Sequence, residues 1–405
     1  MTKKTKSLLL TITVNASRLL LAATFMFSGF IKANDPMGTT YKLEDYVSAM
    51  LWFRLPDTFL LGCSVILALV EFTLGVYILF GIKRNTTSRI TVGFMSLMTL
   101  LTVYIAIANP VEDCGCFGDV LVLSNIGTLA KNIVLLALAI LVCKNYSLQK
   151  NFVSSSIKWL IAIVTLCSIV GYSIYCIICL PVLDFRPYSV GTDMRAVLDS
   201  TSSQKKFDIK IIYEKDGKTL ELSVEDTDPD SSWKYVETRR IPVETSHLAT
   251  ANFYVTDAND EDMTEDILYA DGYTFLLVIP NLMKADEGCI DRVNEIYDYT
   301  REHNTAFYCL TASADERAQI YWNDHTGAEY GYYIAEERML KTVVRGNPGL
   351  VLLKDGVIIK KWSNYNLPNE DDLQDWSKKA EEEKNKAHLH KKINKSEELS
   401  TKHKV

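Results

Sequence analysis

Five long apolar runs in the N-terminal part of the chain constrain its fold more than any other feature. A helix needs roughly 20 apolar residues to cross the hydrocarbon core of a bilayer. The runs that meet this length are about Leu8–Ile31, Thr58–Ile82, Ile90–Asn109, Val122–Cys143 and Ile157–Pro181. We therefore predict an all-α helical membrane bundle with five transmembrane helices, in contact with the lipid bilayer. Charged and polar residues are interspersed after the fifth run, which predicts a soluble domain there.

The first run lies close to the start of the chain and follows three lysines. A signal peptide would have a shorter apolar region and a small-residue cleavage site. This run is longer and lacks such a site, and four further runs follow it. We therefore predict that it is a transmembrane helix.

Lysine and arginine in the short loops predict the orientation, because cytoplasmic loops carry an excess of both. One side of the bundle carries nine of them: Lys3, Lys4, Lys6, Lys83, Arg84, Arg89, Lys144, Lys150 and Lys158. The other side carries Lys32, Lys42 and Arg54. This bias predicts a cytoplasmic N-terminus. With five spans, the C-terminal domain then lies outside the cytoplasm, where disulfides can form.

Overall composition excludes some classes of function. The net charge is −7 and no basic patch stands out, so nothing favours a nucleic-acid partner. Nine cysteines in 405 residues do not make a disulfide scaffold. The positions of the cysteines are therefore more informative than their number.

Cys114 and Cys116 stand on either side of Gly115 in the second outer loop. Two thiols separated by one glycine can close a small, strained disulfide ring that is easily reduced. Gly115 and Gly118 also allow backbone angles that other residues resist. These features favour a redox-active pair at the membrane surface, and a permanent structural disulfide is the alternative. A metal site is disfavoured, because zinc usually takes four ligands and only two are local.

Three segments resemble the DoxX/MauE group of bacterial membrane proteins: 27–36 (FSGFIKANDP), 40–46 (TYKLEDY) and 114–118 (CGCFG). The resemblance covers about residues 8–145 and implies a four-helix unit in the bacterial inner (cytoplasmic) membrane. The MauE branch is associated with thiol chemistry during maturation of a disulfide-rich periplasmic enzyme, alongside a thioredoxin-like partner. The resemblance thus implies a periplasmic thiol/disulfide client for this chain.

Arg18 and Glu71 are the obvious ionisable residues at membrane depth. Each would be costly alone, so both should face the bundle interior. Counting from the helix ends places them at similar depth on antiparallel neighbours, which makes a direct ion pair feasible. The functional interpretation is a polar site for a quinone headgroup or for proton transfer. The alternative is an ion pair that serves packing.

Cys176 and Cys179 end the fifth run on the same side as the loop pair, and their spacing places both on one helical face. They are candidates for a thiol relay. However, a helix C-terminus opposes formation of a thiolate, and unpaired cysteine is commonly buried as a small apolar residue. Packing is therefore the alternative, and we interpret Cys63, Cys143 and Cys167 in the same way.

The soluble region begins with an extended linker. Phe207–Tyr213 and Thr219–Val224 alternate around an Asp-Gly turn, which predicts a β-hairpin, and a third strand is expected near Trp233–Thr238. From about Leu248 strands alternate with helices, as in an α/β sheet. The expected elements are strands at 273–280 and 305–311, helices at 287–302 and 314–322, and two last strands within 342–353 and 358–362.

Residues 248–376 resemble the thioredoxin fold in its TlpA/peroxidase-type form. The family has a cis proline before the penultimate strand, and Pro348 matches it. The family's Cys-x-x-Cys pair should open the first helix, but only Cys289 lies near that point. Cys309 lies within an expected strand and is interpreted as a core residue. One thiol cannot run dithiol exchange, so we interpret this degenerate site as part of a binding module.

The expected domains are 1–145 (DoxX/MauE-like four-helix unit), 146–182 (fifth transmembrane helix), 183–247 (linker and small β-rich segment), 248–376 (thioredoxin-like domain) and 377–405 (charged, disordered tail). The first functional hypothesis is thiol–disulfide chemistry at Cys114 and Cys116 on a periplasmic client, with quinone as the candidate cofactor. The second is a non-enzymatic membrane anchor or assembly factor whose soluble domain binds a partner. The third is a small-molecule or ion pathway around Arg18 and Glu71.

Overall fold

The computed structural model describes residues 3–50, 55–109, 115–121, 123–198, 253–369 and 371–374, and the backbone of three strands between 207 and 242. The chain divides into two compact units, Met1–Ser189 and Val190–Val405. The predicted tail at 377–405 lies outside the described residues.

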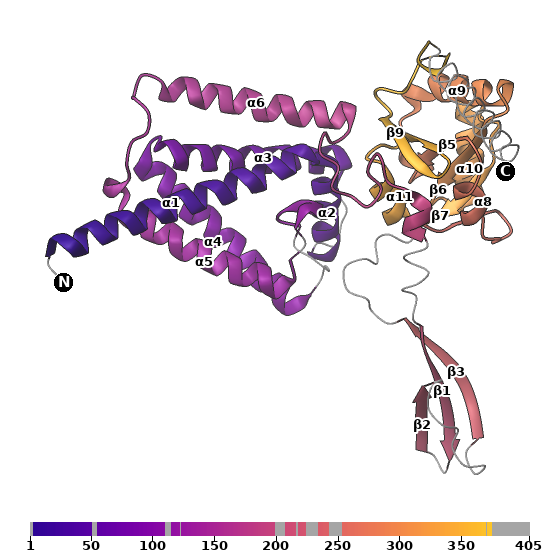
Figure 1. Cartoon of the computed structure of the whole chain (residues 1–405), viewed down its shortest axis with the longest axis horizontal. Coiled ribbons are helices and arrows are strands. Elements are labelled where there is room, and N and C mark those ends of the chain that lie inside the picture. The colour runs from indigo at the N-terminus through magenta and orange to yellow at the C-terminus, as the bar shows by residue number, and fades with distance from the viewer. Residues whose placement is uncertain are drawn as a thin grey trace, which may run out of the picture. The chain divides into compact units, whose positions relative to one another are not determined.

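The first unit is helical (Figure 1). Its elements are α1 (Lys3–Asn34), α2 (Pro36–Met50), α3 (Asp57–Phe80), α4 (Arg84–Ala108), α5 (Asn125–Lys144) and α6 (Lys158–Cys179). All except α2 are long and apolar enough to cross a membrane, which confirms the five predicted spans. Large apolar side chains such as Ile107 and Ile126 are exposed on them, as contact with lipid requires. The protein is a multi-pass membrane protein.

Helices α1 and α3 pack with their backbones in close contact. A Cβ atom added at Gly29 of α1 would collide with the backbone nitrogen of Phe72 and lie 2.8 Å from the carbonyl oxygen of Ala68. A Cβ atom added at Gly75 of α3 would lie 2.7 Å from the backbone nitrogen of Met26. Small residues at such positions are typical of membrane helix pairs, where packing and not the hydrophobic effect drives association. The two glycines therefore set the separation of α1 and α3.

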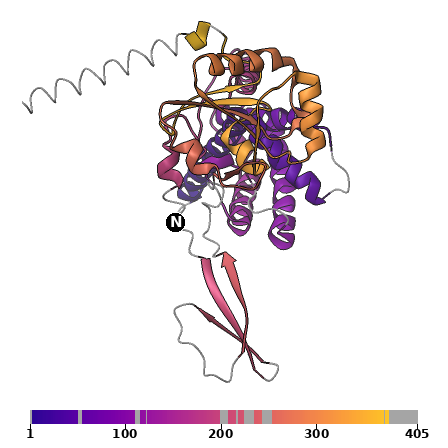
Figure 2. The same cartoon turned by 90° about the vertical axis from the view of Figure 1, so that its right-hand side faces the viewer.

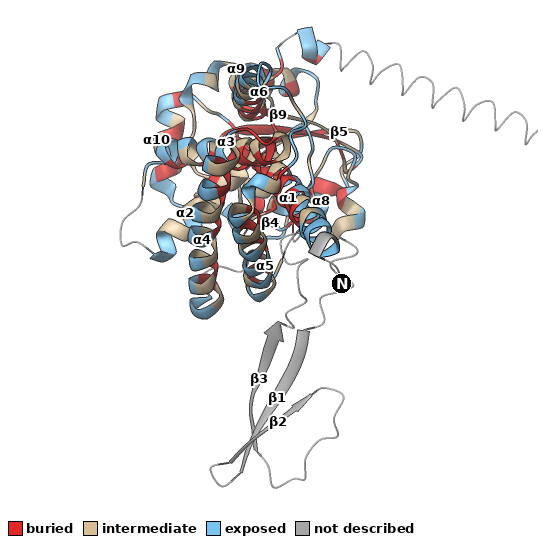
Figure 3. Ribbon diagram, turned by 90° about the vertical axis from the view of Figure 1, so that its left-hand side faces the viewer, coloured by how far each residue is buried: buried red, intermediate tan, exposed pale blue. Residues whose placement is uncertain are grey.

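The interior of the bundle is shared by four helices. One cluster joins Leu21 of α1, Leu74 of α3, Met95 of α4 and Leu135 of α5. Figure 3 shows buried segments on the inner faces of these helices and exposed segments on their outer faces. Helices α1, α3, α4 and α5 therefore form a common core.

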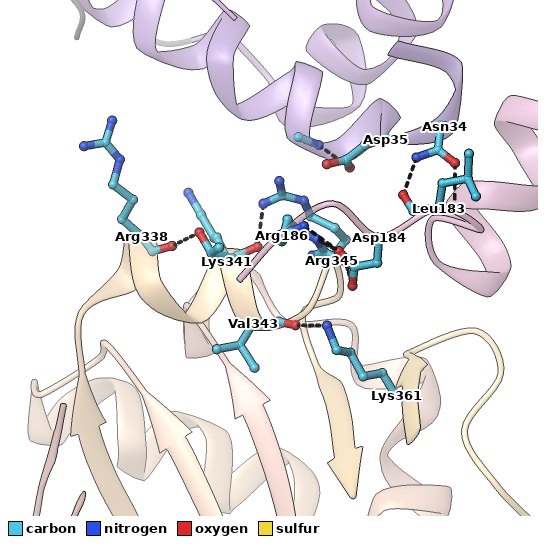
Figure 4. A network of polar contacts seen from close by, with 12 residues as sticks. Asn34, Asp35, Leu183, Asp184, Arg186, Arg338, Lys341, Val343, Arg345 and Lys361 are labelled. Carbon is cyan, nitrogen blue, oxygen red and sulfur yellow. Dashed lines mark hydrogen bonds and ion pairs between the residues drawn. The ribbon is translucent and has the colours of Figure 1, made fainter. Parts of the chain in front are cut away.

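Helix α6 packs against α1 and α3 outside this core. Phe30 and Tyr172 stack with their ring centroids 5.4 Å apart. The amide of Asn34, at the end of α1, donates to the carbonyl of Leu183 at 2.7 Å and accepts from the Leu183 backbone N–H at 3.1 Å (Figure 4). The Tyr172 hydroxyl donates to the same Asn34 oxygen at 2.9 Å. These bonds join the end of α1 to α6 and to the segment that follows it.

The second unit contains two sheets. Strands β1 (Phe207–Lys215), β2 (Lys218–Ser223) and β3 (Lys234–Pro242) form an antiparallel sheet in the order β2-β1-β3 (Figure 2). Lys215 pairs with Lys218 across the hairpin. The predicted hairpin and its third strand are confirmed.

The other sheet is mixed and has the order β4-β7-β6-β5-β8-β9. Its strands are β4 (Val255–Thr256), β5 (Tyr273–Ile279), β6 (Ala306–Thr311), β7 (Tyr332–Ala335), β8 (Gly349–Lys354) and β9 (Val357–Ser363). β5 is parallel to β6 and antiparallel to β8. The helices are α8 (Thr264–Leu268), α9 (Ile290–Glu302), α10 (Glu316–Thr326) and α11 (Glu337–Val343).

β5 is buried on both of its faces, as a central strand of such a sheet should be. Phe275 and Leu277 pack in one cluster with Val293 of α9 and Trp322 of α10. The predicted alternation of strands and helices is therefore confirmed for this mixed sheet, and the predicted cis peptide bond between Asn347 and Pro348 is present. The thioredoxin-like identity of the fold stays a prediction.

Candidate functional site at the Cys-Gly-Cys loop

The loop between α4 and α5 is described from Gly115 onward, and Cys114 lies outside the described residues. Gly115 and Gly118 have positive φ values of 59° and 55°, where glycine is preferred. The Gly118 N–H donates to the Gly115 carbonyl at 3.1 Å, which closes a turn around Cys116 and Phe117. A Cβ atom at Gly118 would lie 3.0 Å from Cγ2 of Ile31. Both glycines are therefore needed for the shape of the loop.

The buried side chain of Lys32, on α1, binds the backbone of this turn. The Lys32 Nζ atom donates to the Cys116 carbonyl at 2.9 Å, to Ser28 Oγ at 2.8 Å and to Glu71 Oε2 at 2.8 Å. The Ser28 hydroxyl also donates to the Cys116 carbonyl, at 2.8 Å. These three acceptors match the three N–H groups of an ammonium. The backbone of Cys116 is thus fixed to α1, and through the ion pair to α3.

The Lys32–Glu71 ion pair is buried on both sides. Removing two charges from water costs several kcal/mol per ion, and mutual attraction with further hydrogen bonds offsets that cost. Here the ammonium has a carboxylate, a hydroxyl and a carbonyl around it. We call the set of Ser28, Lys32 and Glu71 the lysine clamp.

The predicted direct pair between Arg18 and Glu71 is wrong. Arg18 is fully buried, and its guanidinium donates to the carbonyls of Ile78, Leu79 and Lys150. The last carbonyls of a helix have no partner within the helix, and the helix dipole places negative charge there. Arg18 thus stabilises the C-terminal end of α3, roughly 10 Å along the helix axis from Glu71. The two predicted residues do not share one site.

Glu71 and Cys116 also line a small pocket of about 50 Å³ between α1, α3, α4 and α5. Its apolar wall includes Phe94, Met95, Met98, Leu101 and Leu135. Polar groups at the pocket are Thr24, Ser28, Thr102, Lys131 and Asn132. The pocket is therefore mostly apolar, with a few polar groups at its wall.

Two polar residues of α5 mark one side of the pocket. The Lys131 ammonium lies 4.2 Å from the ring centroid of Phe117, a cation–π contact. The buried Asn132 donates to Thr102 Oγ1 at 3.3 Å. The predicted site did not include Lys32 or Lys131. Lys131 is an ionisable residue within the fourth apolar run, which is the signal that could have identified it. Lys32 comes directly after the first run and lacks that signal.

The candidate relay cysteines lie at the end of α6, as predicted. Cys176 is buried and Cys179 is half-buried. Cys63 and Cys143 are half-buried and Cys167 is exposed on α6. Exchange between the α6 pair and the loop stays a prediction.

In the second unit, Cys289 lies beside the cis proline loop. Its thiol donates to the Asp286 carbonyl at 3.2 Å, and the Asp286 N–H donates to the Asn347 carbonyl at 2.8 Å. Burial, followed by the nearby Asp286 charge, raises the pKa of the Cys289 thiol to about 12. This thiol is therefore not activated for nucleophilic attack.

Cys309 of β6 is fully buried, and burial raises the pKa of its thiol well above the ordinary value. It belongs to the core of the mixed sheet, as predicted. Among the residues that the structure describes, no three His, Cys, Asp or Glu side chains are grouped as a metal site would require.

Comparison with known families identifies the part of the chain that carries the loop. Residues 10–144 match the model of the family described as methylamine utilisation protein MauE. Residues 10–144 are a MauE-family membrane domain. No curated protein and no solved structure matches the chain.

The MauE domain contains α1 from residue 10 to its end, α2, α3, α4 and all of α5. Its bounds enclose the lysine clamp, the Cys-Gly-Cys loop and every residue that lines the pocket. The MauE part of the predicted resemblance is therefore confirmed. Helix α6 and the second unit follow the matched segment.

Proposed function

We propose that the MauE domain supports thiol–disulfide exchange with periplasmic client proteins through Cys114 and Cys116. The observation that carries the proposal is the lysine clamp, which fixes the Cys116 backbone by two hydrogen bonds to one carbonyl. A reactive thiol needs a defined position relative to its partner, and groups held by a second layer of hydrogen bonds meet that need. A loop that served only as a connection would not need a buried ion pair beneath it.

The exchange balances without a further reactant. A client thiolate attacks the Cys114–Cys116 disulfide and forms a mixed disulfide, which releases one loop thiol. The second client thiol then displaces the loop sulfur and closes the client disulfide. Two electrons and two protons pass from the client dithiol to the loop pair. For this chemistry the N-terminus is cytoplasmic, and the loop and the second unit both face the periplasm of the bacterial inner membrane.

The second unit has a separate role in this proposal. Its thioredoxin-like mixed sheet has Cys289 with a raised pKa, so it binds or orients the client and leaves exchange to the loop. The same observation favours a second candidate function, a membrane anchor or assembly factor without enzymatic activity. In that case the loop pair would be a permanent disulfide.

Thiol trapping in intact cells that express the full chain distinguishes these functions. Acid quenching and alkylation should show Cys114 and Cys116 partly reduced after a reductant pulse and oxidised again during recovery. Cys116→Ser should accumulate a mixed disulfide between Cys114 and a client. Cys167→Ser, on the exposed side of α6, is the matched control and should behave as wild type. A loop pair that stays oxidised throughout would contradict the redox proposal and support the anchor.

A further inference from the structure

We propose that the bundle binds the headgroup of an anionic phospholipid at the place where α3 ends and α6 begins. Three basic side chains converge there: Arg18 of α1, Arg84 of α4 and Lys158 of α6. We call these three residues the basic cluster. Arg18 lies about 20 Å along α1 from Lys32 of the lysine clamp. The inference therefore goes beyond the thiol chemistry proposed above and does not depend on it.

The basic cluster surrounds Gly81, the residue directly after α3. Gly81 has a positive φ of 66°, and a Cβ atom added to it would lie 3.3 Å from Nη2 of Arg18 and 3.5 Å from Cγ of Arg84. The Lys158 ammonium donates to the Gly81 carbonyl at 3.3 Å. Side chains from three helices thus bring three positive charges around one residue.

The basic cluster has no carboxylate close to it in the sequence. Residues 1–18, 81–89 and 144–158 contain no aspartate and no glutamate. In the described part of the chain, the three side chains donate their hydrogen bonds to backbone carbonyls, although Arg18 is fully buried. The helix dipole places about half of a negative elementary charge at the end of α3, against three positive charges. The excess of positive charge favours a bound anion.

The donors that remain in the cluster suit a phosphate group. A guanidinium has five N–H groups and an ammonium has three, and within the described residues Arg84 and Lys158 each use one. Both side chains are half-buried, so their other N–H groups can reach a ligand outside the bundle. Arginine binds phosphate through two parallel bonds, and lysine binds it as a point charge. The exposed Lys83 and Lys150 add further positive charge beside the cluster.

The surroundings of the cluster favour a lipid over a soluble anion. The exposed ring of Phe152 has its centroid 5.0 Å from the guanidinium carbon of Arg18. Trp159 is 62% exposed next to Lys158, and Leu160 after it is exposed as well. Aromatic side chains gather where lipid headgroups meet the hydrocarbon region, so a headgroup phosphate lies at this level. The proposed orientation places this end in the cytoplasmic leaflet, whose anionic lipids attract basic residues.

Lipid selectivity of the full chain in detergent tests the inference. Native mass spectrometry compares the binding of a phosphatidylglycerol with that of a phosphatidylcholine that has the same acyl chains. Wild type should bind phosphatidylglycerol about ten-fold more tightly, because each basic residue near an anionic headgroup strengthens the attraction. Arg84→Gln with Lys158→Gln should remove most of this preference. Lys144→Gln is the matched control and should bind as wild type, because Lys144 is an exposed lysine at the end of α5 and not part of the cluster.

Two single variants keep the test valid where the double variant does not fold. Lys158→Gln should lose several-fold of the preference, and Lys158→Arg should retain it. Equal binding of the two lipids by wild type would overturn the inference. An equal loss in Lys144→Gln and Lys158→Gln would also overturn it, because any positive surface would then be enough.

Inorganic phosphate distinguishes the lipid from a soluble ligand. Phosphatidylglycerol bound to wild type should stay bound in millimolar inorganic phosphate, because its acyl chains also contact the bundle. Displacement by phosphate at that concentration would assign the cluster to a soluble anion and remove the lipid. None of these measurements involves the loop thiols, so the exchange proposal is tested separately.

Discussion

The Nζ atom of Lys32 lies 2.8 Å from Oε2 of Glu71 and 2.9 Å from the carbonyl oxygen of Cys116. A residue of α1 thus joins a carboxylate of α3 to the backbone of the loop between α4 and α5. The ion pair serves packing and loop position together, and the two roles can be separated by mutation.

Lys32→Met should strongly destabilise the protein, because it leaves the Glu71 carboxylate buried without its cation. Breaking a buried pair from one side costs about 3–5 kcal/mol. Replacing both partners by apolar residues of similar size is often neutral, so Lys32→Met with Glu71→Leu should recover most of that loss. Thermal unfolding of the full chain in detergent measures both variants.

The double variant also tests the clamp itself, because it lacks the ammonium bond to Cys116. We expect its loop pair to exchange with a model dithiol several-fold more slowly than wild type, despite recovered stability. Wild-type exchange rates in the stable double variant would show that the ion pair contributes packing alone.

The outcome at this site shows what the sequence could predict. Glu71 was identified because a carboxylate interrupts a long apolar run. Its partner was missed because Lys32 follows the first run directly and resembles a loop residue, whereas α1 continues to Asn34. The four-residue spacing of Ser28 and Lys32 was the available signal. Depth counted from helix ends could not reveal that Arg18 meets carbonyls at the end of α3, because those acceptors are backbone atoms.

In the mixed sheet, the long apolar strands could be predicted from the sequence and the short elements could not. β5 and β6 were predicted because central strands are continuous apolar runs of the right length. The short elements β7 (Tyr332–Ala335) and α11 (Glu337–Val343) were missed, since four and seven residues carry too little periodicity. The helix α2 was missed for another reason. Its sequence is polar, and it is held by contacts such as the bond from Ser64 Oγ to the Pro36 carbonyl.

Arg18→Lys should destabilise the bundle although it preserves the charge. A lysine cannot reproduce the planar guanidinium that reaches three carbonyls at once. Hydrogen bonds to charged groups contribute about 1.5–3 kcal/mol each, so a loss in this range is expected in unfolding experiments. Arg18 lies about 20 Å along α1 from Lys32. The exchange rate of the loop pair in folded protein should therefore not change, and a selective loss of exchange would assign Arg18 a functional role.

Gly75→Ala should weaken the packing of α1 against α3. The added methyl group would lie 2.6 Å from Cγ of Met26 and 2.7 Å from its backbone nitrogen, so the helices must separate. Overpacking of this kind typically costs about 1–3 kcal/mol. Gly62→Ala on the same helix is the matched control, because nothing lies within 4 Å of its new methyl group. Folded yield and thermal stability should fall for the first variant only. Equal effects would mean that helix propensity, and not contact with α1, decides the result.

Cys289 should be alkylated slowly in the folded protein, because the thiolate is the reactive form and its pKa is raised to about 12. At pH 8 we expect a rate about a thousand-fold below that of the same thiol in the denatured chain, whose pKa is near 9. Mass spectrometry of the Cys289 peptide measures both rates.

Because the pKa of the Cys289 thiol is higher in the folded state than in the unfolded state, the unfolded state loses its proton first as the pH rises. The contribution of this thiol to stability is complete below about pH 9 and declines as the pH rises toward 12. Asp286→Asn should lower the pKa in part, since burial is the larger cause. Rapid alkylation of folded protein at pH 8 would contradict the inactive assignment and restore Cys289 as a candidate nucleophile.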